Sequence, residues 1–129
     1  MEKDRPKQQV AKMGYVVGDV EGKTAVLVDD MIDTAGTLCA AAETVLEAGA
    51  ASVIACATHG VFSGPAFERL PTEKSHIERI VVTDTIPLAD GHPDNITVLS
   101  TAQTLADSIR RIFTDDSVSE IFAGENQLF

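Results

Sequence analysis

The residues best suited to chemistry lie in one short segment, VLVDDMIDTAGT, at positions 26–37. Two adjacent carboxylates, Asp29 and Asp30, follow an apolar run and precede a turn of small and hydroxyl residues. Carboxylates repel a phosphate, but their oxygens accept hydrogen bonds from sugar hydroxyls and are the hard donors that Mg²⁺ prefers. The pair therefore suits either a sugar or a magnesium ion.

The turn after the carboxylates has the features of an anion site. Backbone amides at a helix start attract a phosphate together with the helix dipole, and the Thr34 and Thr37 hydroxyls can donate further hydrogen bonds. Gly36 lets a phosphate approach the backbone. This strand–turn–helix unit predicts a sugar phosphate ligand. A strand that ends in Asp before a Thr-capped helix is also common without a ligand, so spacing alone leaves both interpretations open.

Alternating strands and helices are expected to position this segment. Residues 24–28 form an apolar, β-branched run, typical of a strand buried on both faces of a parallel sheet. Further strands are expected at 15–20, 52–58, 77–83 and 96–99, and helices at 38–48 (stopped by Gly49), 64–70 and 101–113, the last with Leu105, Ile109, Ile112 and Phe113 inward. This order predicts an α/β fold with a mainly parallel sheet, whose ligands bind beyond the carboxyl ends of the strands.

Size and charge exclude several classes of protein. The 129 residues suffice for one domain, expected over 15–129 after a polar arm at 1–14. A formal net charge of −10 argues against a binder of nucleic-acid phosphates, and 5% aromatic residues without Trp argue against a platform for stacking single strands. The sequence has no run of about 18 apolar residues, so no membrane-spanning helix is predicted. Cys39 and Cys56 are expected to be reduced core residues, as in a cytoplasmic protein.

Two other side chains near predicted strand ends leave alternatives open. His59 follows a predicted buried strand, so it could bind magnesium or ATP, but a hydrogen-bonded loop histidine is the favoured interpretation. Asp84 either lines a ribose pocket or caps the turn before Pro87. His76 and His92 have no neighbouring ligand pattern and are expected at the surface.

The string DDMIDTAGT at 29–37 resembles the phosphoribosyl-pyrophosphate motif of type I phosphoribosyltransferases. Further segments narrow the resemblance to the ribose-phosphate diphosphokinases, also called phosphoribosyl pyrophosphate synthetases. These segments are KDRP at 3–6, GDV at 18–20, ATHGVFSGPA at 57–66, TDTIP at 83–87 and SVSEIF at 117–122. The resemblance extends over nearly the whole chain and implies a phosphoribosyltransferase-like, Rossmann-like domain.

The resemblance also implies an activity. The family transfers the diphosphoryl group of ATP to the C1 hydroxyl of ribose 5-phosphate, with Mg²⁺ required and AMP released, and so feeds nucleotide biosynthesis. By this resemblance Asp29 and Asp30 hold the ribose hydroxyls, and are also the possible metal ligands. The residues implied to wrap the 5-phosphate are Asp33, Thr34, Ala35, Gly36 and Thr37.

Two more groups of residues take roles from the resemblance. Lys3 and Arg5 match the basic residues of the family's flexible catalytic loop, of which 1–14 would be the remnant; Asp4 stands where relatives often have a third basic residue. A mobile basic arm of this kind stabilises charge on the moving phosphates. The terminal residues Ser117, Ser119 and Phe122 resemble a segment that contributes to an allosteric phosphate or ADP site, the alternative being a short packing helix.

The length sets an expectation about activity. Family members have two tandem domains and about 300 residues, and the resemblance covers only the C-terminal half with the loop before it. We therefore expect a fragment that is inactive or weakly active by itself and that associates with its own kind, as intact members form hexamers. ATP and ribose 5-phosphate are the expected partners. The alternatives are a non-catalytic ribose 5-phosphate or phosphoribosyl-pyrophosphate binding module, or a phosphoribosyltransferase, for which no base-recognition hood is found.

Overall fold

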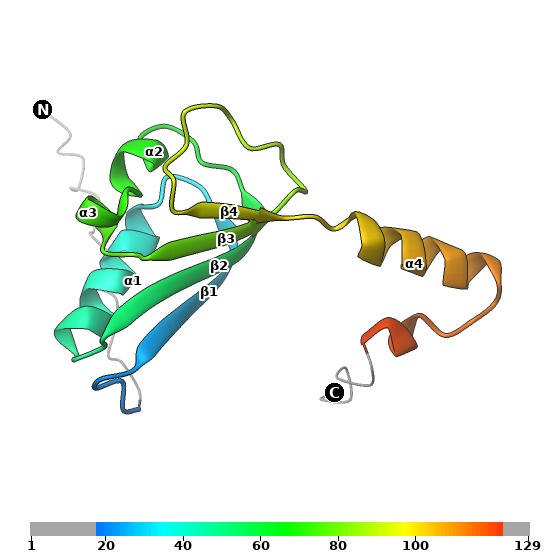
Figure 1. Ribbon diagram of the computed structural model, residues 1–129, viewed down its shortest axis with the longest axis horizontal. Helices are drawn as coiled ribbons and strands as arrows, with labels where there is room; N and C mark the ends of the chain where they lie inside the picture. Colours follow the sequence, from blue (N-terminus) through cyan, green and yellow to red (C-terminus); the bar gives the residue numbers. More distant parts are fainter. Residues whose placement is uncertain (1–17, 123–129) are drawn as a thin grey trace, which may run out of the picture.

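Four parallel strands form the frame of the chain. The computed structural model describes residues 18–122, and within them the strands lie in the order β1–β2–β3–β4 (Figure 1). Their bounds are Thr24–Ile32 for β1, Ser52–Gly60 for β2, Arg79–Thr83 for β3 and Ile96–Leu99 for β4. Each strand pairs in parallel with the next one along the chain. The predicted α/β fold with a mainly parallel sheet is confirmed.

Helices connect the strands and extend the chain beyond β4. They are α1 at Gly36–Glu47, α2 at Ala66–Arg69, α3 at Thr72–Ser75, α4 at Ala102–Phe113 and the 3₁₀ helix η1 at Val118–Phe122. The predicted helix at 64–70 is α2, and α3, which was not predicted, follows it directly after Pro71. Proline has no amide hydrogen and cannot continue α2. The predicted strand at 15–20 lies partly outside the described residues, and 18–20 form no strand.

The end of α1 follows from one glycine. Gly49 has a φ of +98°, a left-handed conformation that costs glycine little. Its amide donates to the Leu46 carbonyl at 2.9 Å, and the next amide, of Ala50, donates to the Val45 carbonyl at 3.1 Å. These two bonds satisfy carbonyls that a helix end would otherwise leave unpaired. The predicted stop at Gly49 is confirmed.

One face of the sheet is closed by the core. Every second residue of β2 and β3 is buried on this face, where Leu38 and Ala42 of α1 pack against them. The alanines of β2 are small, so α1 can lie close to the sheet. The largest fully buried side chains are Leu70, Ile77, Ile80, Val53 and Val82. The core thus joins β2 and β3 to the segments that follow β2.

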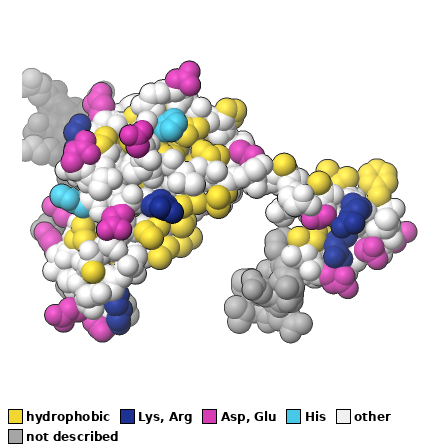
Figure 2. Space-filling view, in the orientation of Figure 1, with side chains coloured by type: hydrophobic (Ala, Val, Ile, Leu, Met, Phe, Trp, Pro, Cys, Tyr) yellow, Lys and Arg dark blue, Asp and Glu magenta, His cyan; other side chains and the backbone are white. Residues whose placement is uncertain are grey.

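The other face of the sheet carries apolar side chains without a helix over them among the described residues. Val28 is 80% exposed, and Val26 and Leu99 are also exposed. Figure 2 shows hydrophobic side chains exposed along the sheet and on α4. The prediction that residues 24–28 are buried on both faces is therefore wrong within the described part of the chain, because helices cover only one face.

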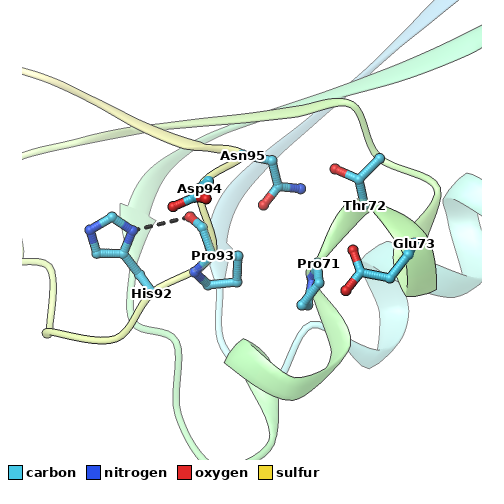
Figure 3. A pocket seen from close by; sticks show the side chains of 7 residues that line it. All are labelled: Pro71, Thr72, Glu73, His92, Pro93, Asp94 and Asn95. Carbon is cyan, nitrogen blue, oxygen red and sulfur yellow. Dashed lines mark hydrogen bonds between the residues drawn. The ribbon is translucent and has the colours of Figure 1, made fainter.

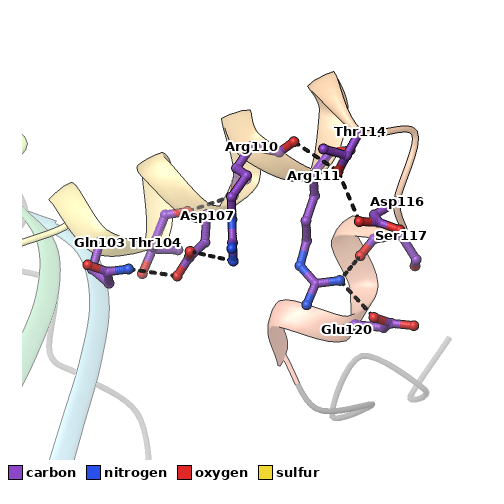
Figure 4. A network of polar contacts seen from close by, with 10 residues as sticks. Gln103, Thr104, Asp107, Arg110, Arg111, Thr114, Asp116, Ser117 and Glu120 are labelled. Carbon is purple, nitrogen blue, oxygen red and sulfur yellow. Dashed lines mark hydrogen bonds and ion pairs between the residues drawn. The ribbon is translucent and has the colours of Figure 1, made fainter.

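Helix α4 projects away from the sheet (Figure 1). The predicted apolar stripe exists, but the expectation that it points inward is wrong: none of its residues is buried, and Phe113 is 86% exposed. The opposite, polar side of α4 is tied to the segment after it (Figure 4). There Arg111 donates to the Ser117 carbonyl at 2.9 Å and pairs with the Glu120 carboxylate at 2.7 Å. The amphipathic pattern was correct, but the sequence does not specify what faces the stripe.

Asp84 fixes the point where the chain leaves the sheet for α4. Its carboxylate accepts hydrogen bonds from Ser100 Oγ at 2.6 Å, from the Thr101 amide at 2.8 Å and from Thr101 Oγ1 at 2.7 Å. These bonds, the one from Ser100 first, lower the pKa of Asp84 to about 2. These partners precede α4, so the hydrogen bonds do not cap the turn before Pro87; a place in the ribose pocket stays a prediction. Among the helices at 18–122, none has the length and apolarity that a membrane crossing requires.

Truncation of a core leucine tests which surfaces are packed. We expect Leu70→Ala to lower the free energy of unfolding by about 2–5 kcal/mol, because it leaves a cavity at a fully buried position. Leu105→Ala, at an exposed position of α4, should change it by less than about 0.5 kcal/mol. Urea denaturation of both variants measures the difference. An equal loss in the two variants would mean that α4 packs against a core.

The hydrogen bonds to Asp84 predict a pH-dependent stability. A carboxyl whose pKa is lower in the folded chain contributes stability above its unfolded pKa, about 3.9, and loses it as the pH falls through the folded value of about 2. We therefore expect the melting temperature of the wild type to exceed that of Asp84→Asn by a constant amount above pH ~5. This difference should shrink between about pH 4 and pH 2.

Asp90→Asn is the matched control for this measurement. Asp90 is exposed, and its carboxylate forms no hydrogen bond with the residues that the structure describes. A difference for Asp84→Asn that stays constant down to pH 2, or the same trend in both variants, would contradict the role given to Asp84.

Candidate functional site

A cavity of about 240 Å³ opens where β1 passes into α1. Six of the seven residues that sequence analysis assigned to ribose 5-phosphate line it, all except Asp30. The lining residues are Asp29, Met31, Ile32, Asp33, Thr34, Ala35, Gly36, Thr37 and Leu38. The carboxyl end of a strand and the start of a helix thus meet in one concave surface.

Asp29 and Asp30 lie within β1, not after it as predicted. The strand continues through both to Ile32, because Asp29 is in register with Ala57 and Ile32 with Gly60 of β2. Successive side chains of a strand point to opposite faces, so the two carboxylates are separated across the sheet. Asp29 lies at the cavity and accepts a hydrogen bond from the Asp30 amide at 2.9 Å. Both residues are exposed.

The start of α1 offers free donors to an anion. The first amides of a helix have no partner within it, and here no side chain caps them. The first turn contains no acidic residue that could occupy the site in place of a ligand. The Cys39 amide makes the first helical bond, to the Ala35 carbonyl at 3.0 Å. The amides before it are therefore available at the cavity.

Ala35 gives the turn its shape. Its φ of 61° lies in the left-handed region, which is uncommon for residues other than glycine. Such a conformation costs about 1–3 kcal/mol and persists only where the surroundings impose it. Ala35 is 5% exposed and belongs to the core, so packing of its side chain in the core helps to impose this conformation.

The segment after β2 holds the turn from one side. The amides of Val61 and Phe62 both donate to the Ile32 carbonyl at 3.0 Å, and the Ser63 amide donates to the Asp33 carbonyl at 3.1 Å. Ser63 Oγ also donates to the Asp33 carboxylate. The Asp33 side chain is thus engaged by Ser63, which places it as a support of the turn. Sequence analysis quoted this segment as part of a family pattern but assigned Ser63 no role.

Gly60 lets that segment return over the sheet. A Cβ at Gly60 would lie 2.4 Å from a ring carbon of Phe62, so no other residue fits without moving the ring. The Phe62 ring packs against Phe67, with centroids 5.4 Å apart. Close packing at this glycine therefore sets the path of the residues that bind Ile32 and Asp33.

His59 belongs to a hydrogen-bonded group at the neighbouring strand ends. Its Nδ1 lies 2.8 Å from Thr85 Oγ1, and Thr85 Oγ1 donates to the Thr58 carbonyl at 3.2 Å. Thr83 Oγ1 donates to the same carbonyl at 2.7 Å. The favoured interpretation of His59 as a hydrogen-bonded histidine agrees with this geometry, although the residue lies in β2 and not in a loop. His76 and His92 are exposed, as expected.

A cavity of about 340 Å³ lies apart from the predicted residues (Figure 3). Its lining residues are Pro71, Thr72, Glu73, His92, Pro93, Asp94 and Asn95. The Asn95 amide nitrogen donates to the Leu70 and Ile77 carbonyls, each at 2.9 Å, and so joins the loop before β4 to the segment around α3. None of the residues assigned to the sugar phosphate lines this larger cavity.

Ser117 and Ser119 are not brought to the cavity at β1. Ser117 and Ser119 lie beyond α4 and are exposed, and the Ser117 carbonyl accepts a hydrogen bond from Arg111. The side chain of Phe122 and the residues Lys3 and Arg5 lie outside the described part of the chain. Arg69, which sequence analysis did not single out, contacts the turn: its Nη1 donates to the Thr34 carbonyl at 2.9 Å.

Ribose-phosphate pyrophosphokinases are among the known proteins that are similar to this chain. It is 53% identical over 123 residues to a ribose-phosphate pyrophosphokinase of Caldanaerobacter subterraneus, and 51% identical over 126 residues to one of Clostridium acetobutylicum. These matches cover 95% and 97% of this chain but 38% and 39% of the relatives, so the chain spans well under half the length of the curated relatives it matches.

A solved structure and a family model agree with these relatives. The crystal structure of phosphoribosylpyrophosphate synthetase from Mycobacterium smegmatis superposes with a TM-score of 0.70 at 46% identity, over 77% of this chain and 33% of that one. The model of the phosphoribosyl synthetase-associated domain matches residues 3–123. The resemblance read from the sequence is confirmed, and the chain belongs to the phosphoribosyl synthetase-associated domain family.

Proposed function

We propose that this chain forms the ribose 5-phosphate site of a ribose-phosphate diphosphokinase. That enzyme transfers the diphosphoryl group of ATP to the C1 hydroxyl of ribose 5-phosphate and gives phosphoribosyl pyrophosphate and AMP. One observation carries the proposal: the cavity at the end of β1 combines a carboxylate with the uncapped start of α1. A sugar phosphate needs both an acceptor for its hydroxyls and donors for its phosphate.

The residues at the cavity divide these tasks. The amides at the start of α1 and the Thr34 and Thr37 hydroxyls donate to the 5-phosphate. Asp29 accepts a hydrogen bond from a ribose hydroxyl. Asp30 is assigned a second hydroxyl or a metal from the resemblance alone; its carboxylate is exposed on the other face of β1.

Magnesium fits this site as an ion shared with substrate. No group of three potential ligands gathers anywhere in residues 18–122, so these residues alone do not form a closed metal site. Mg²⁺ is commonly bound by one or two carboxylates together with substrate phosphates, and Asp29 supplies one carboxylate at the cavity. When bound, the ion neutralises charge on the transferring phosphates.

The cationic groups of the reaction are proposed from the resemblance. Charge on a moving diphosphoryl group needs positive partners, and no Lys or Arg of the described residues lines the cavity. We assign this role to Lys3 and Arg5, with ATP as their ligand. We also propose assembly with other copies of the chain and a role of Ser117, Ser119 and Phe122 in binding a regulatory phosphate. The two free cysteines support a cytoplasmic location.

A second candidate function is binding without turnover. It is favoured by the same lining, which provides for a sugar phosphate but contains no Lys or Arg within the described residues. A module of this kind would bind ribose 5-phosphate or phosphoribosyl pyrophosphate. The two functions differ in AMP formation and share the binding step.

Calorimetry with ribose 5-phosphate tests the shared binding step. We expect Thr37→Ala and Asp33→Ala to weaken binding by at least about tenfold, because one removes a donor and the other releases the turn from Ser63. Thr104→Ala, on exposed α4, is the matched control and should bind as the wild type does. Wild-type affinity in both turn variants would remove the phosphate assignment.

AMP formation separates the two functions. We expect the purified chain with ATP, Mg²⁺ and ribose 5-phosphate to release AMP at no more than a trace, because it spans only 38% and 39% of the length of the ribose-phosphate pyrophosphokinases that it matches. Lys3→Ala and Arg5→Ala should abolish any such trace and leave ribose 5-phosphate binding unchanged. Robust AMP formation by the chain alone would establish a diphosphokinase and exclude the binding module.

A further inference from the structure

Arg69 is the one cation among residues 18–122 that donates a hydrogen bond to the turn between β1 and α1. It stands at the end of α2, 35 residues away along the chain, and its Nη1 donates to the Thr34 carbonyl at 2.9 Å. A Cβ placed on Gly36 would lie 3.2 Å from the same nitrogen. The guanidinium therefore lies close to the residues before and after Ala35, which are Thr34 and Gly36.

The hydrogen bond from Arg69 acts on the peptide next to Ala35, the residue with the left-handed conformation. The Thr34 carbonyl belongs to the peptide that joins Thr34 to Ala35, whose φ is 61°. A hydrogen bond from a charged donor is stronger than one from a neutral group, so it helps to hold this peptide in its orientation. The orientation of the following amides, at the start of α1, depends on the same peptide.

The charge of Arg69 also reaches the turn. Among the described residues no carboxylate lies within 4.0 Å of its guanidinium, so the charge is not neutralised by an ion pair there. This charge acts on the Cys39 thiol in α1. Burial raises the pKa of the thiol, and the positive charge of Arg69 opposes that rise. The other charged side chains that line the same cavity as Arg69 and Gly36 are Glu43, Glu68 and Lys74.

A third cavity lies at this contact. It measures about 450 Å³, and Arg69, Lys74 and Cys39 are among its lining residues. Gly36 lines both this cavity and the one at the end of β1. Arg69 lines this cavity and is not among the residues that line the cavity at the end of β1. Direct contact with a phosphate is not required for its effect.

We propose that Arg69 is a positioning residue for the 5-phosphate, which it serves by holding the Thr34 carbonyl and by adding positive charge next to Gly36. This inference rests on the proposed function, because it takes ribose 5-phosphate as the ligand. It adds a residue outside the segment 29–37 to the phosphate site. Arg69 stabilises the loop conformation that presents the α1 amides, and the small Gly36 leaves room for its guanidinium.

The experiment compares four forms of the full chain: wild type, Arg69→Gln, Arg69→Lys and Lys74→Ala. Lys74 is the matched control, since it lines the same cavity but donates to the Glu68 carbonyl at 2.8 Å and not to the turn. Calorimetry measures affinity for ribose 5-phosphate at low and high salt. Amide hydrogen exchange of the ligand-free chains measures the stability of the turn through the amides of Cys39, Phe62 and Ser63, which donate to backbone carbonyls at 32–35. Melting temperatures report on folding.

We expect Arg69→Gln to weaken ribose 5-phosphate binding about tenfold and to reduce its salt dependence, because one charge–dipole contact and one charge are lost. Arg69→Lys should recover part of the affinity, since it keeps the charge but not the planar fork. Lys74→Ala should bind within about twofold of the wild type. Exchange of the Cys39, Phe62 and Ser63 amides should be faster in Arg69→Gln than in Lys74→Ala.

Three results would overturn the inference, and they are distinguishable. If the wild type binds ribose 5-phosphate and Arg69→Gln binds equally well, the role of Arg69 is wrong and the proposed function stands. If the wild type shows no binding, the proposed function fails and the phosphate role of Arg69 fails with it. Equal losses in Arg69→Gln and Lys74→Ala would also overturn the inference, because cavity charge alone would then explain them.

Discussion

The turn from β1 into α1 depends on a backbone conformation that its own residue disfavours. Ala35 adopts a left-handed φ of 61°, and only then does the chain reverse from strand to helix with the α1 amides free. The cost is met by contacts from elsewhere: the Ala35 side chain is in the core, and Val61 and Ser63 bind the residues before it. The segment that follows β2 is therefore as much a part of the site as the motif itself.

The pairing of β1 with β2 places the residues that support this turn. Pairing of β1 with β2 brings Ile32 beside Gly60, and the absence of a side chain at Gly60 lets Phe62 turn back over the sheet. That return places Ser63 beside Asp33 and leads into α2, which carries Arg69. A strand register, a glycine and a packed ring thus set the position of polar groups that lie far apart in the sequence.

Two apolar surfaces in the described part of the chain lack a covering element. Parallel sheets are commonly covered on both faces, yet Val28 on the open face is 80% exposed, and the apolar stripe of α4 ends in an exposed Phe113. Exposed apolar area of this kind usually marks a contact surface. The known relatives are more than twice as long as the region they share with this chain.

The local sequence pattern predicted most helices and strands well, but it predicted less well which residues they contact in the fold. Strand β4 was predicted at its observed bounds, and α4 to within one residue, because period and breakers are local signals. The placement of Asp29 and Asp30 after the strand was wrong, since strand length depends on pairing with β2, which lies 28 residues further along the chain. The stripe of α4 was correct, but the side it faces is a tertiary property. Arg69 and Ser63 were missed because their partners at the turn, Thr34 and Asp33, are 35 and 30 residues away.

The central claim is that the amides at the start of α1 bind the phosphate of a sugar phosphate. Amide chemical-shift mapping by NMR, during a titration with ribose 5-phosphate, tests this most directly. The account predicts saturable shifts that are largest at residues 34–38, with those of α4 unchanged. Shifts centred on the cavity at Pro71 and Asn95, or no saturable shift at the turn, would contradict it.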